Sequence, residues 1–193
     1  MVDLKELADE RGLAEGTLDW AGLVVVEDGQ YDGWYGIPYR NATGIWKWRY
    51  RHPDRDGRPK YQDEFGAKFH LYNPGVLGPG HPEVWFCEGE FDTLVLWELG
   101  VPAIGIHGTA NVGTEDDSEE GRVPKSWALL FENSKVTVAF DNDEAGHRAG
   151  RRLAAGLNGV MFEPWANYGD LNEWYKADPV GLERAVERFR EHR

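Results

Sequence analysis

The pattern of apolar and polar residues divides the chain near residues 73–83. From Leu23 to about Asn73 the sequence is rich in aromatic and β-branched residues, and turn-forming stretches such as EDGQ, RNATG and DRDGRP interrupt it. Residues of these types, separated by Gly, Asp and Pro, favour short strands joined by turns. We therefore expect a small antiparallel sheet in this part of the chain.

Beyond residue 83, short apolar runs alternate with stretches of helical periodicity. The expected strands are Val84–Cys87, Ala103–Ile106, Val136–Phe140 and Gly159–Phe162. Apolar residues recur at helical spacing at Ala145, Ala149, Leu153 and Leu157, and again at Leu182, Val186 and Phe189. Continuous apolar strands separated by helices are typical of a parallel sheet that helices cover on both faces. The sequence thus predicts an α/β domain, in a chain that is α+β overall.

The change of pattern also predicts a linker. The stretch NPGVLGPGHPE, from Asn73 to Glu83, holds three prolines and three glycines, and such a composition suits a connection between domains. We expect an N-terminal subdomain over residues 1–73, a linker over 74–83 and the α/β domain over 84–193.

Composition excludes several classes of protein. Hydrophobic residues make up 41 % of the 193 residues, which is enough to bury a core. No apolar run approaches the roughly 20 residues that span a bilayer, so we expect no membrane segment and a cytoplasmic location. The single cysteine, Cys87, excludes an internal disulfide and a four-cysteine zinc site, so we expect no structural zinc. The net charge of −13 argues against a general nucleic-acid coat, although basic residues gather between Arg40 and Lys68.

Acidic side chains follow two of the expected strands at the point where each strand ends. The turn FCEGEFD places Glu88, Glu90 and Asp92 after the first strand, and AFDNDEAG places Asp141, Asp143 and Glu144 after the third. Ligands of open α/β sheets bind at the carboxyl ends of the strands. Two carboxylates about 5 Å apart repel each other by roughly 3 kcal/mol, and a bound cation removes that repulsion. Because carboxylate oxygens suit Mg²⁺ or Mn²⁺, the sequence predicts a divalent-metal site.

A simpler interpretation exists for each acidic turn taken alone. Asp and Gly after a strand commonly form only a turn and the N-cap of the next helix. The presence of two acidic strand ends in one domain favours the metal site. A capping role for any one of the aspartates stays open.

Together the two acidic turns resemble the toprim fold that primases, topoisomerases and certain nucleases share. The motif E-G-x-x-D is formed by Glu88, Gly89 and Asp92, and the motif D-x-D-x-A-G by Asp141, Asp143, Ala145 and Gly146.

Three further stretches resemble primases in particular. IHGTAN, which contains Gly108 and Thr109, is similar to a strand-loop of bacterial and phage primases, and YGDLNEWYKADP, which contains Asp170, is similar to their third acidic motif. Gly169 stands where the family commonly has Lys. The segment from Gly36 to Asn73 resembles the N-terminal part of the primase polymerase core, and LADERGLAEGTLDWAGL resembles a short helical lead-in of phage primases.

The resemblance implies a metal-dependent primase that synthesises short primers on single-stranded DNA. Glu88, Asp141 and Asp143 would be the catalytic, metal-binding residues, with Mg²⁺ or Mn²⁺ as cofactor, and Asp92 and Asp170 would support them. The residues expected to contact nucleotide or template are Arg49, Lys60, Tyr61, Gly108 and Thr109. The partners implied are a single-stranded DNA template, nucleoside triphosphates and a replicative helicase. The helicase would be a separate protein, because the sequence contains neither the four-cysteine module nor the G-x-x-x-x-G-K-[ST] motif of helicase-primases.

Strand alternation in IWKWRYR adds an expectation about faces. Trp46 and Trp48 alternate with Lys47 and Arg49, and we expect the tryptophans to be buried and the cations to lie outside. The alternative is that the aromatic residues of this segment are exposed and stack on bases of a single-stranded template.

Two other functions remain open. One is a toprim nuclease that cuts nucleic acid with the same metals. The other is a non-catalytic, replication-associated binding module that keeps the fold. A topoisomerase is disfavoured because the chain has no room for the domains that carry a nucleophilic tyrosine and pass a strand.

Overall fold

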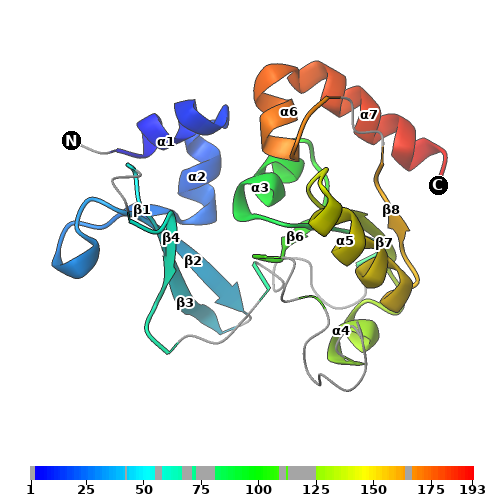
Figure 1. Ribbon diagram of the computed structural model, residues 1–193, viewed down its shortest axis with the longest axis horizontal. Helices are drawn as coiled ribbons and strands as arrows, with labels where there is room; N and C mark the ends of the chain where they lie inside the picture. The colour runs from blue at the N-terminus through cyan, green and yellow to red at the C-terminus, as the bar shows by residue number, and fades with distance from the viewer. Residues whose placement is uncertain are drawn as a thin grey trace.

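Two four-stranded sheets, one antiparallel and one parallel, organise the chain (Figure 1). The structure is a computed structural model that describes residues 3–41, 43–54, 58–66, 71–72, 81–108, 112, 125–163 and 167–193. In Figure 1 the antiparallel sheet lies with the first two helices on one side of the molecule, and the parallel sheet lies with the remaining helices on the other. The predicted fold class, an α/β domain after a small antiparallel sheet, is confirmed.

Two short helices precede the antiparallel sheet. They are α1 (Leu4–Arg11) and α2 (Glu15–Ala21). The carboxylate of Asp3 caps α1 by accepting the N–H of Glu6 at 2.7 Å. Each helix ends at a glycine in the left-handed region, Gly12 with φ 66° and Gly22 with φ 77°, a conformation that only glycine adopts without strain. The helical lead-in is therefore a helix pair with a tight turn after each helix.

The N-terminal sheet has the strand order β1-β2-β3-β4, and all its pairs are antiparallel. Its elements are β1 (Val24–Val25), the 3₁₀ turn η1 (Gly29–Tyr31), β2 (Tyr35–Asn41), β3 (Gly44–Arg51) and β4 (Tyr61–Asp63). Directly opposed residues of neighbouring strands point to the same face. Tyr39 lies opposite Lys47, Ile37 opposite Arg49 and Tyr35 opposite Arg51. We call the face that these six residues share the inner face of the N-terminal sheet.

The second sheet is parallel and has the order β6-β5-β7-β8. Its strands are β5 (Glu83–Cys87), β6 (Ala103–Gly105), β7 (Lys135–Ala139) and β8 (Val160–Met161). The helices of this part are α3 (Glu90–Glu98), α4 (Lys125–Leu130), α5 (Glu144–Gly156), α6 (Leu171–Ala177) and α7 (Pro179–Glu191). Each of the four predicted strands is present within two residues of its expected bounds.

The hydrophobic core joins the two parts of the chain. Leu7 of α1, Leu18 of α2 and Ile37 of β2 belong to the same buried cluster as Leu94 of α3 and Trp174 of α6. A second buried cluster, which includes Phe86, Val138 and Leu153, covers the other face of the parallel sheet. The two parts therefore share a core, and their division into domains stays a prediction.

The apolar stripes of the two long helices are largely as expected. Ala149, Leu153 and Leu157 are buried beneath α5, and Leu182 and Val186 beneath α7. Ala145 is an exception, because it lies exposed in the first turn of α5.

The prediction about the faces of β3 was wrong. Trp46 is 42 % exposed, whereas Lys47 is only 3 % exposed. The reason is that the inner face packs against acidic partners: Lys47 lies 2.9 Å from Asp63, and Arg49 lies 2.6 Å from Glu90. Alternation assigns residues to one of two faces, and the partners on the neighbouring elements decide which face is buried.

Two of the expectations concern residues that the structure does not describe. They are the nucleotide contact of Thr109 and residues 74–80 of the expected linker. None of the helices in the described ranges is both long and apolar enough to cross a membrane.

Candidate active site

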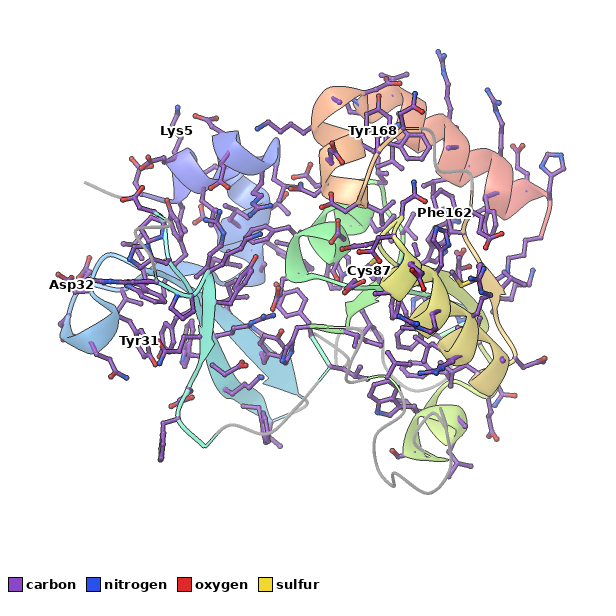
Figure 2. The ribbon with its side chains drawn as sticks, in the orientation of Figure 1. Lys5, Tyr31, Asp32, Cys87, Phe162 and Tyr168 are labelled. Atoms are coloured by element: carbon purple, nitrogen blue, oxygen red, sulfur yellow. The ribbon has the colours of Figure 1, made fainter. Side chains whose placement is uncertain are left out.

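The parallel sheet brings the two acidic turns together. β5 and β7 are direct neighbours, with Cys87 paired to Ala139, so Glu88 and Asp141 follow adjacent strand ends. In Figure 2 the label of Cys87 marks the end of β5, at the edge of the sheet where these turns lie. The order of the strands in the sheet therefore brings together the two acidic turns that the sequence predicts to be neighbours.

A cavity of about 170 Å³ opens between the carboxyl ends of β5 and β7 and the N-terminal sheet. Its lining residues are Arg11, Arg49, Lys60, Tyr61, Glu88, Gly89, Glu90, Phe91, Asp92, His107, Gly108, Asp141, Asp170 and Asn172. Carboxylates from the parallel sheet and cations from the N-terminal part thus line one space. We call Glu88, Asp92, Asp141 and Asp170 the acidic wall.

The acidic wall concentrates more negative charge than the protein around it neutralises. Burial and the charges of Asp92, Glu88 and Asp170 raise the pKa of Asp141 to about 8. Burial, followed by the charge of Asp170, raises the pKa of Asp92 to about 7, although the bond from the Asn172 N–H opposes that rise. A carboxyl group with so high a pKa is stabilised either by a proton or by a nearby cation.

Two of the predicted aspartates serve as helix N-caps. Asp143 accepts the N–H of Gly146 at 2.7 Å at the start of α5, and Asp170 accepts the N–H of Glu173 at 2.5 Å at the start of α6. Asp170 also lines the cavity, whereas Asp143 is exposed and is not among the lining residues. The structure therefore brings Glu88, Asp141 and Asp170 together and leaves Asp143 at the rim, within electrostatic range of Asp141.

The glycine of the D-x-D-x-A-G turn allows a close approach of two backbone segments. A Cβ atom at Gly146 would lie 2.2 Å from the carbonyl oxygen of Asp141, well inside van der Waals contact. A side chain at this position would displace the Asp141 backbone. Gly146 therefore fixes the distance between α5 and the strand end that carries Asp141.

Asp92 connects the acidic wall to α6 and α1. Asp92 is buried, with 8 % of the residue exposed, and its carboxylate accepts the backbone N–H of Asn172 at 2.9 Å. The Asn172 side chain in turn donates to the carbonyl of Arg11 at 2.8 Å and accepts from the Arg11 guanidinium at 3.3 Å. The Arg11 guanidinium lies over the Phe91 ring, 4.4 Å from its centroid. This chain of contacts places a cation of the helical lead-in in the cavity.

Arg49 crosses from the inner face of the N-terminal sheet to the parallel sheet. Its Nη1 atom donates to Oε1 of Glu90 at 2.6 Å, and the hydroxyl of Tyr39 donates to the same oxygen at 2.5 Å. The Arg49 guanidinium also lies 4.3 Å from the centroid of the Tyr61 ring. Burial raises the pKa of Tyr61 to about 12, so its hydroxyl stays protonated at neutral pH.

His107 lies beside this pair and is neutral at pH 7. Burial, followed by the charges of Arg49 and Lys47, lowers its pKa to about 4. Its Nδ1 atom is 3.3 Å from the Tyr39 hydroxyl, and its Nε2 atom is 3.7 Å from Asp63. Its neighbour Gly108 lines the cavity with φ 82°.

The donor set of the acidic wall fits a divalent cation that keeps part of its water shell. In the described ranges, no group of three or more His, Cys, Asp or Glu side chains is arranged to hold a metal ion by itself, so a cation here would need ligands from water or substrate as well. Mg²⁺ commonly binds through one or two carboxylates and retains several waters. The raised pKa of Asp141 shows that positive charge is in deficit at this wall. Of the three predicted metal ligands, Glu88 and Asp141 line the cavity, and Asp143 does not.

Sequence reasoning missed part of the site. The motifs do not point to Tyr39 or Arg11, and they place Glu90 in the acidic turn without indicating that it pairs with a cation. Tyr39 could have been found from its period-two spacing with Ile37, which places it on the inner face. No local signal points to Arg11, because Asn172, which holds it, is 161 residues away.

Comparisons with known proteins agree with this geometry. Residues 85–175 match the family model described as Toprim-like. This part of the chain is similar to toprim-like domains. All four residues of the acidic wall lie within the matched range.

Similar proteins include a phage protein and primase cores. The gene 57 protein of Mycobacterium phage D29 is 28 % identical over 147 residues, which cover 74 % of this chain and 90 % of that protein. The primase fragment of the bacteriophage T7 primase-helicase protein is 23 % identical with a TM-score of 0.66, over 93 % of this chain and 71 % of that one. The RNA polymerase domain of Mycobacterium tuberculosis primase DnaG is 17 % identical with a TM-score of 0.66, over 95 % and 75 %. The chain thus has the fold of primase catalytic cores, from the helical lead-in to α7.

Proposed function

We propose that this chain is the catalytic core of a DNA primase, a nucleotidyltransferase that uses Mg²⁺ or Mn²⁺ to synthesise short primers on single-stranded DNA. One observation carries the proposal: a single cavity has carboxylates on one wall and Arg49, Lys60 and Arg11 around it. This combination suits a metal-bound triphosphate, because the carboxylates attract the cation and the basic residues attract the phosphates.

In this proposal the acidic wall and the basic residues of the cavity have separate roles. Glu88 and Asp141 hold the divalent cation, and Asp92 and Asp170 add negative charge that favours it. When bound, the cation neutralises phosphate charge and lowers the pKa of the attacking 3′-hydroxyl. Arg49 and Lys60 bind phosphate groups of the nucleotide or the template, Arg49 with a planar fork and Lys60 with a point charge. Tyr61 and Gly108 also line the cavity and contribute to its shape.

The similar proteins support the replication context. Their names describe a T7 primase fragment and the RNA polymerase domain of a bacterial primase, one of whose solved complexes contains double-stranded DNA with an overhang. One title names primase domains of T7 bound to an RNA/DNA hybrid. By analogy we propose that this chain acts in the cytoplasm on a single-stranded template, together with a separate replicative helicase.

A primer-synthesis assay tests the proposal. The protein is incubated with mixed-sequence single-stranded DNA, labelled nucleoside triphosphates and either Mg²⁺ or Mn²⁺. Short labelled oligomers are expected from the native protein and not from Asp141→Asn. A control variant, Asp178→Asn, changes an aspartate that caps α7 and is not among the residues of the cavity, and it is expected to keep full activity.

Other results of the same assay would contradict the proposal. Metal-dependent cutting of the template would identify a toprim nuclease. If no oligomers form even with a replicative helicase added, and the folded protein binds no Mg²⁺, the chain is a binding module.

A further inference from the structure

The Arg49–Glu90 pair is a buried ion pair that joins the two sheets. The Arg49 side chain is 14 % exposed and that of Glu90 only 3 %. Their atoms approach to 2.6 Å although the residues are 41 positions apart in the sequence. Burying two charges costs desolvation free energy, which pairing offsets only in good geometry. We therefore ask what function this buried pair serves besides packing.

Contacts on two sides restrict the orientation of the Arg49 guanidinium. One edge donates to Glu90, and one face lies against the Tyr61 ring at 4.3 Å from the centroid. Tyr61 is the first residue of β4, whose residue Asp63 pairs with Arg49 in the sheet register. A guanidinium held at an edge and at a face has lost most of its rotational freedom before any ligand arrives.

Glu90 is in turn held in place by a second donor. The Tyr39 hydroxyl donates to the same carboxylate oxygen that receives the Arg49 bond. Glu90 is also the first residue of α3, where the partial positive charge of a helix N-terminus favours an ionised carboxylate. These contacts keep Glu90 directed at Arg49, although it lies only two residues from Glu88.

We propose that Glu90 is a positioning residue that, with Tyr39 and the Tyr61 ring, fixes the Arg49 guanidinium in the cavity for recognition of a phosphate group. The inference takes its ligand class, a nucleoside triphosphate, from the proposed function. An arginine that is already oriented loses less conformational entropy when it binds a phosphate, so its affinity for that phosphate is higher.

This proposal predicts the opposite sign from a simple charge effect. If Glu90 acted only through its negative charge, its neutralisation would make the cavity more positive and strengthen the binding of an anion. If Glu90 positions Arg49, the same change weakens binding. The sign of the effect of Glu90→Gln on nucleotide affinity therefore separates the two roles.

The test is an equilibrium titration of the native protein and of variants with ATP in the presence of Mg²⁺. The matched control is Glu98→Gln, at the other end of α3. Glu98 accepts bonds from Ala14, Thr17 and Tyr175 and does not line the cavity. We expect Glu90→Gln to weaken ATP binding about tenfold and Glu98→Gln to change it less than about twofold.

A double mutant shows whether Glu90 acts through Arg49. In an Arg49→Ala background, Glu90→Gln is expected to cause no further loss of ATP affinity, because the group that it positions is absent. If Glu90→Gln does not fold, Tyr39→Phe replaces it, since this change keeps the ring and removes the second bond to Glu90 together with the 3.3 Å contact to His107. Tyr39→Phe is expected to weaken ATP binding about twofold to threefold.

Specific results would overturn the inference. A folded Glu90→Gln protein that binds ATP as tightly as the native protein, or more tightly, contradicts it, and so does an undiminished effect of Glu90→Gln in the Arg49→Ala background. If the native protein makes primers but the variants show no such pattern, the inference alone fails. If the pattern holds but no primers form, the proposed function fails. A native protein that binds no ATP contradicts both.

Discussion

The acidic wall of the cavity and the inner face of the N-terminal sheet hold their charges in different ways. On the inner face each cation has an acidic partner: Lys47 pairs with Asp63, Arg49 with Glu90 and Arg51 with Glu10. On the acidic wall, carboxylates crowd together, and the pKa of Asp141 rises to about 8. The positive charges of the inner face are neutralised by acidic residues of the protein, whereas the negative charges of the acidic wall are neutralised only when a proton or a cation binds.

This difference separates structural charge from functional charge. A paired buried ion contributes to the folded state, and the loss of its partner destabilises the protein. A cluster of like charges opposes folding and persists where function requires it. We therefore expect mutations on the two sides of the cavity to change stability in opposite directions.

The largest expected effect is the loss of activity in Asp141→Asn. The amide cannot replace the carboxylate as a metal ligand, so primer synthesis is expected to fall by about 1,000-fold or more. The rate of primer synthesis at saturating Mg²⁺ measures this effect. The metal-free variant is expected to be more stable than the native protein at pH 8, because a crowded negative charge has been removed. A variant that is inactive but less stable would contradict the comparison.

On the inner face the sign of the stability change is reversed. Arg51 is 4 % exposed, and its Nη2 atom lies 2.6 Å and 2.8 Å from the two oxygens of Glu10. Arg51→Ala removes this pair and leaves a gap, so the free energy of unfolding is expected to fall by roughly 2–4 kcal/mol. Urea denaturation measures the loss. An unchanged denaturation midpoint would show that the pair contributes nothing.

The pH dependence of stability also distinguishes the acidic wall from the inner face. The folded-state pKa values of Asp141 and Asp92, about 8 and about 7, lie above their ordinary value of 3.8. Between pH 4 and 8 the folded state therefore binds more protons than the unfolded state at these groups, and stability falls as pH rises. His107, with its lowered pKa of about 4, has the opposite effect up to pH 6.5.

The window from pH 6.5 to 8 is consequently the one in which the two aspartates dominate. We expect the metal-free native protein to lose up to about 2 kcal/mol of stability across this window, and Asp141→Asn to lose less. Thermal denaturation at several pH values checks this expectation. A stability that rises with pH in the window would contradict the assignment of raised pKa values to the acidic wall.

The smallest expected effect concerns Asp143, for which capping and metal binding are alternatives. Asp143→Ala removes the α5 cap and is expected to reduce stability by about 1 kcal/mol. Asp143→Ser keeps a capping oxygen and is expected to be nearly as stable as the native protein. If Asp143→Ser also loses primer synthesis, the carboxylate is needed for the metal. If it retains synthesis, Asp143 is only a cap.

The sequence predicted the parallel sheet and its acidic edge because both depend on local patterns. Apolar runs such as Val136–Phe140 identify strands, and the carboxyl ends of parallel strands must meet at one edge, which brings Glu88 and Asp141 together. The resemblance to primases added Arg49 and Lys60, which the structure does place in the cavity.

The sequence did not predict which face of β3 is buried or what Glu90 contacts. Both depend on how the two sheets pack, and this is set by contacts such as Arg49–Glu90 that join distant parts of the chain. Alternation showed that Lys47 and Arg49 share a face, but it carried no information about the acidic partners opposite that face.

The effect of Mg²⁺ on the melting temperature at pH 8, compared between the native protein and Asp141→Asn, tests whether the acidic wall holds a cation. A cation that binds the folded state at the acidic wall stabilises it by mass action. We predict that millimolar Mg²⁺ raises the melting temperature of the native protein and leaves that of Asp141→Asn nearly unchanged. An equal response in both proteins, or no response in the native protein, would contradict the claim that the acidic wall is built to hold a cation.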